Sequence, residues 1–249
     1  MTDIEIPRPT SGDVIELILD DHRLFEDLLR ECRRSDADRA AARQALAELL
    51  VAHAVAEEEK VYPDLRRARA IGAHEEEHSE EEHAEINEAL LAFLEAKGTD
   101  TQKYDDALEE LATAVNHHAG EEETDILNPA REDLSIDRRE SLGVAWATRR
   151  NQLLEEGCAS AEQVAALLAE AVDEGVLAPE EAREEADAVK DVWNRVRKVV
   201  SKIHEQTNDE DRKIYDSVIE NARELIELLP ALNLTNDPNF KYARHLVAE

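Results

Sequence analysis

Apolar residues recur every three or four positions along four stretches in the first half of the chain, which is the period of one face of an α-helix. Residues that favour helix starts precede these stretches, and Pro63, Gly98 and the pair Asn128-Pro129 follow three of them. Because the connections are short, the pattern predicts an all-α fold in which the helices form an antiparallel up-down four-helix bundle. The predicted helices span about residues 13–34, 38–62, 76–97 and 101–127.

Helical patterns continue beyond the fourth stretch. A fifth helix is predicted at about residues 135–156, and further helices are predicted in the remainder of the chain. We expect residues 1–157 to contain the bundle and this fifth helix. Residues 158–249 are then a C-terminal helical extension of unknown role, whose helices are a candidate homodimer interface.

The chain is strongly acidic, because 60 Asp and Glu residues against 29 Lys and Arg residues give its 249 residues a net charge of -31. Such a surface repels nucleic acid and anionic lipid, so we exclude both as main partners. No run of 18 apolar residues exists, and Cys32 and Cys158 are too few for a disulfide framework or a thiolate metal site. We therefore expect a cytoplasmic protein in which the acidic surface mainly provides solubility.

Six polar side chains interrupt the apolar seams of the four predicted helices. In the first helix, His22 falls between Ile18 and Phe25 at the spacing that faces the core. A polar group buried without a partner costs roughly 1–3 kcal/mol, and one shared metal cluster would give all six a partner. The candidate metal ligands are His22, His53, Glu57, His83, His118 and Glu122.

The six candidates follow a symmetrical pattern. The first and third helices each carry one histidine, whereas the second and fourth each carry a His-x-x-x-Glu pair whose members stack on one helix face. Distances from the predicted turns place all four histidines in one layer of the bundle. Two glutamates can then bridge two ions, for which imidazole and carboxylate ligands favour iron or manganese, with zinc as a competitor. Six side chains shared by two ions leave positions open for O₂ or peroxide.

A purely structural interpretation competes with the metal site. With 60 acidic residues in the chain, a carboxylate four residues after a histidine arises easily by chance, and a lone histidine on a seam is usually a hydrogen-bonded core residue. The metal interpretation depends on all six positions falling on seams at matching heights. His74, His78 and His117 lie off the seams, so we expect them at the surface or beside the site, with His78 as the main rival ligand.

Four segments between residues 12 and 129 resemble the hemerythrin HHE cation-binding family. The resemblance implies a non-haem di-iron four-helix bundle, with oxo- or hydroxo-bridged iron and a role in O₂, NO, peroxide or iron handling. It carries the ligand role to the same six residues. Asn128 stands where the family often has proline, with Pro129 one residue late. The segments are LILDDHRLFEDLL, HAVAEEEKVYP, EEHAEINEALLAFL and NHHAGEEETDILNP.

Two functions remain open at this point. The first is a protein that binds or senses O₂, NO or H₂O₂, or handles iron. The alternative is a di-iron enzyme, either an oxidase or a peroxide-decomposing protein with catalase-like activity. A metal-free helical interaction protein is a third interpretation. An acid–base group beside the metals would distinguish an enzyme, and Glu26, Tyr62 and Glu121 are the candidates nearest in sequence.

Overall fold

The computed structural model describes residues 4–178. The described residues up to Leu177 belong to one compact unit. Most of the predicted C-terminal extension, with its further helices and its candidate dimer interface, lies outside the described residues. The boundary after residue 157 stays a prediction.

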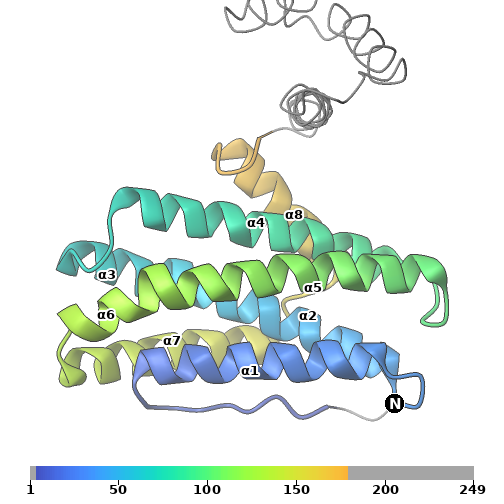
Figure 1. The fold of residues 1–249 in the computed structure, drawn as a ribbon, viewed down its shortest axis with the longest axis horizontal. Helices are drawn as coiled ribbons and strands as arrows, with labels where there is room; N and C mark the ends of the chain where they lie inside the picture. Colours follow the sequence, from blue (N-terminus) through green and yellow to red (C-terminus); the bar gives the residue numbers. More distant parts are fainter. Residues whose placement is uncertain (1–3, 179–249) are drawn as a thin grey trace, which may run out of the picture. The chain divides into compact units, whose positions relative to one another are not determined.

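All regular elements of the described residues are helical, and four long helices form the bundle (Figure 1). The bounds of these four are α1 Val14–Arg33, α2 Arg39–Ala56, α4 Ala73–Glu95 and α5 Gln102–Glu122. They contact one another in a ring, α1 with α2, α2 with α4, α4 with α5, and α5 with α1. Three of the four starts follow the sequence signals, since Asp13, Asp38 and Thr101 each accept a hydrogen bond from a backbone N–H of the first turn. Helix α4 begins three residues before its predicted start near residue 76, after Gly72, which has no side chain to cap it. The predicted all-α bundle is confirmed for this part of the chain.

Two additional helices cover the bundle. Helix α7 (Ile136–Glu156) packs against α1 and α2, and α8 (Ala161–Asp173) packs against α4. Ser135 caps α7 at its start, and Gly157 ends it with a φ of 74°. The predicted fifth helix is therefore confirmed. No helix among residues 4–178 is long and apolar enough to span a membrane.

The bundle contains two apolar cores with a polar layer between them. Phe25 of α1 belongs to one core and Ile18, two turns earlier, to the other. The same change occurs along α5, where Val115 lies in the first core and Ile126, which follows α5, lies in the second. The seams of α1 and α5 therefore pass from one core to the other through the layer that contains the six interrupting residues.

Two of the predicted helix ends are wrong, because both helices continue past their prolines. After α2 the chain makes one π-helical turn, η1 (Glu57–Val61), and goes on as α3 (Tyr62–Ala68). After α5 it makes a second, η2 (Glu123–Leu127), followed by α6 (Asn128–Asp133). Pro63 and Pro129 each stand directly after a π-helical turn, as the second residue of α3 and α6. Proline inside a continuous helix removes one backbone hydrogen bond, and in both places it coincides with this local change of helix geometry. The wide turns begin at Glu57 and directly after Glu122, in keeping with the frequent use of π-helical turns at functional sites.

Candidate metal centre

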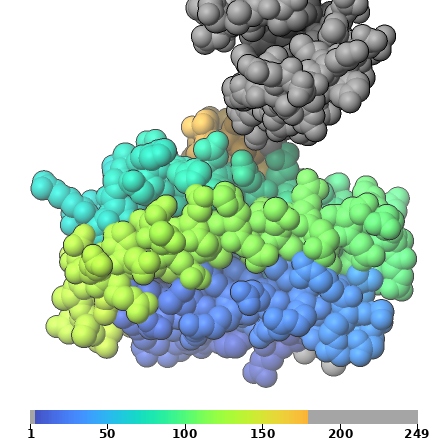
Figure 2. Space-filling view, viewed as in Figure 1, coloured from blue at the N-terminus to red at the C-terminus, as the bar shows by residue number. Residues whose placement is uncertain are grey.

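The structure brings the six predicted side chains together in the polar layer. Each residue is at most 6 % exposed, and Figure 2 shows that the side chains of α1, α4 and α5 form a closed surface over this face of the bundle. Their donor atoms form two groups of three, in each of which all donors lie within 4.8 Å of one another. The first group is His22, His53 and Glu122, and the second is Glu57, His83 and His118.

Glu57 connects the two groups. Its Oε1 lies 3.1 Å from Nε2 of His53, and its Oε2 lies 3.5 Å from Nε2 of His83. One carboxylate therefore faces a histidine of each group, as a bridging ligand must. The Nε2 atoms of His83 and His118 are only 2.9 Å apart, so two imidazole nitrogens of the second group also converge on one point.

Several of the converging atoms have no hydrogen-bond partner. They are Nε2 of His22 and His53, Oε1 of Glu57 and Oε2 of Glu122. Nε2 of His22 lies 3.1 Å from Oε2 of Glu122, and Nε2 of His53 lies 3.1 Å from Oε1 of Glu57, but neither pair forms a hydrogen bond. Buried polar atoms are nearly always paired, and a cation would give all four a ligand bond. The donor set therefore fits a metal centre of nitrogen and oxygen ligands.

Nδ1 of every histidine in the cluster is hydrogen-bonded to a carboxylate. Since a carboxylate only accepts, each Nδ1 carries the proton, and each Nε2 is left to face the interior. Such carboxylate–histidine pairs are typical of metal-bound histidines, because they fix the ring and raise its basicity. The Nδ1–oxygen pairs are His22 with Glu123 at 3.0 Å, His53 with Asp21 at 3.2 Å, His83 with Glu58 at 2.7 Å, and His118 with Glu82 at 2.9 Å.

A buried ion pair supports the carboxylate behind His53. Asp21 accepts from Nε and Nη2 of Arg150 at 2.6 and 2.7 Å, and the guanidinium also donates to the backbone oxygen of Pro7 at 3.0 Å. Arg150 is fully buried. Trp146, one turn earlier on α7, stands edge-on to the His53 ring with centroids 5.8 Å apart. Helix α7 thus fixes the orientation of a cluster histidine although it contributes no residue to the cluster.

Tyr62 lies against both glutamates of the cluster. Its hydroxyl is 3.2 Å from Oε1 of Glu122 and 3.4 Å from Oε2 of Glu57. The side chain is fully buried, and the π-helical turn η1 separates it from Glu57 by one wide turn of helix. Burial first, and then the nearby carboxylates, raise the pKa of Tyr62 well above its ordinary value. The phenol therefore keeps its proton and acts as a donor.

The two glutamates differ in their proton affinity. Burial and the negative charge of Glu122 raise the pKa of Glu57 well above its ordinary value. Burial also opposes ionisation of Glu122, but the adjacent imidazole of His22 outweighs it and holds the pKa of Glu122 below its ordinary value. Glu57 therefore binds a proton more tightly than Glu122 does. Because metal ligands bind in the deprotonated form, cation binding at Glu57 competes with its proton.

Two histidines of the cluster also differ in their pKa values. Burial lowers the pKa of His53 to about 4, although Asp21 works in the opposite direction. Burial lowers that of His22 as well, but the carboxylates of Glu122 and Glu123 more than offset it and the net pKa is raised. His53 is therefore a neutral imidazole with a free Nε2 at neutral pH, which is the form that binds metal.

The three histidines outside the seams lie outside this cluster. His78 and His117 have side chains that are 45 % and 61 % exposed, and His74 is also exposed and stacks on His78 with ring centroids 6.1 Å apart. His78 instead forms a third group with Glu82 and Glu121. The structure therefore separates the rival ligand from the six-residue cluster.

Sequence reasoning missed the residues that support the cluster. Each of the four supporting acids is adjacent in sequence to a predicted ligand, yet it serves a histidine on another helix. In a chain with 60 acidic residues this adjacency carries little information. Arg150 gave no signal at all, because it lies 129 residues from Asp21. The four acids are Asp21, Glu58, Glu82 and Glu123.

Comparisons with known proteins agree with this geometry. Residues 13–129 match the family described as the Hemerythrin HHE cation binding domain, and this segment contains all six residues of the cluster. No curated protein and no solved structure is significantly similar to the chain. Residues 13–129 therefore form a hemerythrin-like HHE cation-binding domain.

Proposed function

We propose that the six-residue cluster is a non-haem di-iron centre that binds O₂, NO or peroxide in a cytoplasmic protein. The observation that supports it most directly is the position of Glu57, whose two oxygens face histidines of both donor groups. Imidazole and carboxylate donors without thiolate suit iron or manganese, and zinc is a chemical competitor. Iron with open coordination positions would provide the binding site for O₂, NO or peroxide.

The protein itself contributes orientation and apolar surroundings. The four supporting carboxylates fix the imidazole rings, and Arg150 fixes one of these carboxylates in turn. The apolar cores on both sides of the layer leave the pocket at Glu122 as a route for water and small molecules. Tyr62 keeps a proton at Oη and holds both glutamates through it.

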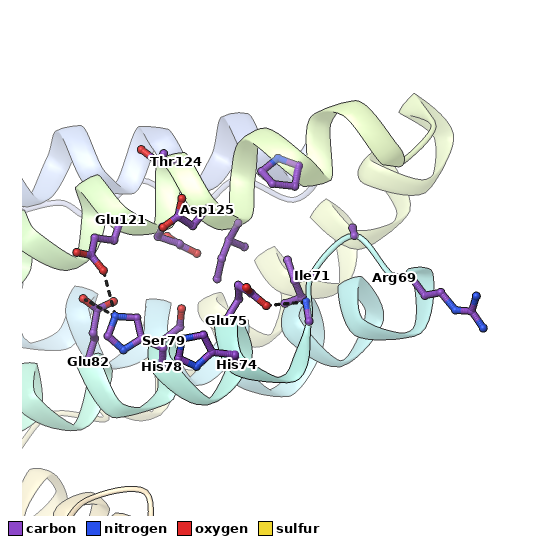
Figure 3. Close-up of a pocket in the computed structure, with 15 residues that line it drawn as sticks. Arg69, Ile71, His74, Glu75, His78, Ser79, Glu82, Glu121, Thr124 and Asp125 are labelled. Atoms are coloured by element: carbon purple, nitrogen blue, oxygen red, sulfur yellow. Dashed lines mark hydrogen bonds and ion pairs between the residues drawn. The ribbon is translucent and has the colours of Figure 1, made fainter.

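A pocket gives small molecules access to this layer. Its volume is about 790 Å³, and its walls include Glu122 of the cluster, Ile126 and Pro129 (Figure 3). A diatomic gas or peroxide is far smaller than this volume. The pocket therefore supports a small-molecule ligand, because it leads from the surface to a carboxylate of the cluster.

Turnover of peroxide or O₂ is the second candidate function. Tyr62 favours it, because a protonated phenol beside the cluster is placed to give a proton to a small molecule bound there. Release of O₂ after addition of H₂O₂ to the iron-loaded protein would distinguish catalase-like turnover from simple binding.

Iron content after aerobic loading and removal of loosely bound metal tests the proposal. We expect two irons per chain with a near-ultraviolet absorption band, and loss of both signals in His53→Ala and His118→Ala. His74→Ala is the matched control, because this exposed histidine lies outside the cluster. Full iron binding in the double variant Glu57→Ala, Glu122→Ala would show that the proposal is wrong.

A further inference from the structure

A second set of histidines and glutamates lies on the outer side of α4 and α5. Each helix contributes a His-x-x-x-Glu pair, His78 with Glu82 on α4 and His117 with Glu121 on α5. Nε2 of His78 lies 3.0 Å from Oε2 of Glu121 and 3.9 Å from Oε1 of Glu82. Nε2 of His117 lies 3.4 Å from Oε1 of Glu121 and 3.7 Å from Oε1 of Glu82. We name these four residues the outer group.

Glu82 distinguishes this group from an ordinary surface ion-pair network. The residue is only 5 % exposed, and its Oε1 has no hydrogen-bond partner. That oxygen faces both outer histidines, whereas Oε2 accepts from Nδ1 of His118 in the six-residue cluster. An ion pair between His78 and Glu121 accounts for those two side chains but leaves the buried oxygen of Glu82 unpaired. A cation bound by the outer group would satisfy it.

The outer group also lies at the pocket that reaches the cluster. His78, Glu82 and Glu121 lie together at one end of the pocket in Figure 3, and Glu122 of the cluster lines the same pocket. The lining also contains the acids Glu75 and Asp125, and Arg69, the one Lys or Arg that the described residues contribute to it, lies at the far end. Such a lining attracts cations and concentrates them near the group.

We propose that the outer group binds one divalent cation, of the Fe²⁺ or Zn²⁺ class, and serves as the entry site through which the six-residue cluster is loaded. Two imidazoles and two carboxylates are a suitable donor set for such an ion. Because His78 and His117 are about half exposed, water completes the coordination and the ion exchanges readily. Glu82 links the two sites, with one oxygen in the outer group and the other on His118. Only the loading role depends on the proposed function, since the outer site can bind a cation by itself.

Titration of the full-length, iron-loaded chain with Co²⁺ tests the binding. We expect one Co²⁺ per chain beyond the iron. Removal of a residue that only supports a metal ligand lowers metal affinity by roughly 10–100-fold, and removal of a ligand itself should lower it at least as much. We therefore expect the Co²⁺ affinity to fall by at least that factor in the double variant His78→Gln, Glu121→Gln. The matched control is Glu77→Gln, which removes one carboxylate from an exposed position of α4 outside the outer group and leaves in place His74, which stacks on His78.

Two results would overturn the binding site. One is the absence of additional Co²⁺ in the unaltered chain, and the other is an equal affinity in the test and control variants. Glu121→Gln alone repeats the measurement if the double variant unfolds. Anomalous X-ray scattering from crystals soaked in Zn²⁺ gives a direct readout, with a peak expected between His78, Glu82 and Glu121.

The rate of Fe²⁺ uptake tests the loading role separately. The metal-free test variant should take up iron roughly tenfold more slowly than the control variant, in proportion to the weakened outer site, while it reaches the same final iron content. Equal uptake rates would refute the entry role. Failure of the cluster itself is distinguishable, because then neither the unaltered chain nor the control would retain two irons.

Discussion

Arg150 and Asp21 form a buried bidentate ion pair between α7 and α1, and the same carboxylate accepts from Nδ1 of His53. A helix outside the four-helix ring thereby controls the orientation of a cluster residue. Asp21 is buried and cannot be solvated by water, so the guanidinium of Arg150 compensates its charge.

Arg150→Met should destabilise the protein strongly. Methionine fills most of the space but leaves Asp21 as an unpaired buried charge, which costs about 3–5 kcal/mol. Urea unfolding measures the effect. Iron release should also accelerate, because Asp21, the hydrogen-bond partner of His53, is no longer held in place by Arg150. Arg149→Met is the control, since Arg149 pairs with Glu59 at the surface and such pairs contribute about 0–1 kcal/mol. Equal stabilities of the two variants would contradict the role of Arg150.

Tyr62→Phe should weaken iron binding while the bundle remains folded. The variant removes the hydroxyl that lies against both Glu57 and Glu122, and the loss of such a supporting group costs roughly tenfold or more in metal affinity. Competition with a chelator measures it. Tyr104→Phe is the control, because the hydroxyl of Tyr104 lies near the backbone oxygens of Cys32 and Arg39. It should cost about 1 kcal/mol of stability and leave iron affinity unchanged.

Gly143→Ala should destabilise the contact between α7 and the start of α1. A Cβ at this position would overlap the backbone oxygen of Gly12 and press on the backbone nitrogen of Val14. Backbone atoms cannot move aside, so we expect a cost of roughly 1–3 kcal/mol or more. Gly120→Ala provides the opposite control, since its Cβ meets no atom within 4 Å and alanine favours a helix by about 0.5–1 kcal/mol. Thermal unfolding measures both effects, with a lower midpoint expected for Gly143→Ala and a higher one for Gly120→Ala.

The two cysteines should react slowly with thiol reagents at neutral pH. Burial raises the pKa of Cys32 to about 11 and, together with the carboxylate of Glu48, that of Cys158 to about 12. Since only the thiolate reacts, alkylation by iodoacetamide should accelerate between pH 8 and about pH 10. Rapid alkylation of the folded chain at pH 7 would contradict the burial of both thiols, whereas the urea-unfolded chain should react at once.

The same pKa shifts predict weaker folding in alkali. An unfolded cysteine ionises at its ordinary pKa of 9.0, whereas folded Cys32 keeps its proton to about 11. The unfolded state therefore loses its proton first, and the free energy of unfolding falls as the pH rises above 9. Cys32→Ser should reduce this dependence, which urea titrations at pH 8 and pH 10 can measure. An unchanged pH dependence in the serine variant would count against Cys32 as its source.

The sequence by itself determined that six polar residues share one layer of the bundle. Spacing of three and four residues places His22 and the His-x-x-x-Glu pairs on inward helix faces wherever the helices form, because that relation is fixed by local backbone geometry. It also determined the starts of α1, α2 and α5, since a capping side chain acts on the first turn of its own helix. The bundle and the meeting of six polar residues within it could be predicted from these local rules.

Only the tertiary structure decided which groups support that layer. Each supporting acid serves a histidine on a different helix, and Arg150 reaches Asp21 across 129 residues, so no local pattern contains these pairings. The continuation of both helices through Pro63 and Pro129 depended on the π-helical turns, which local propensity does not predict. The outer group likewise becomes a site only when α4 and α5 pack, because its two His-x-x-x-Glu pairs face each other across that contact.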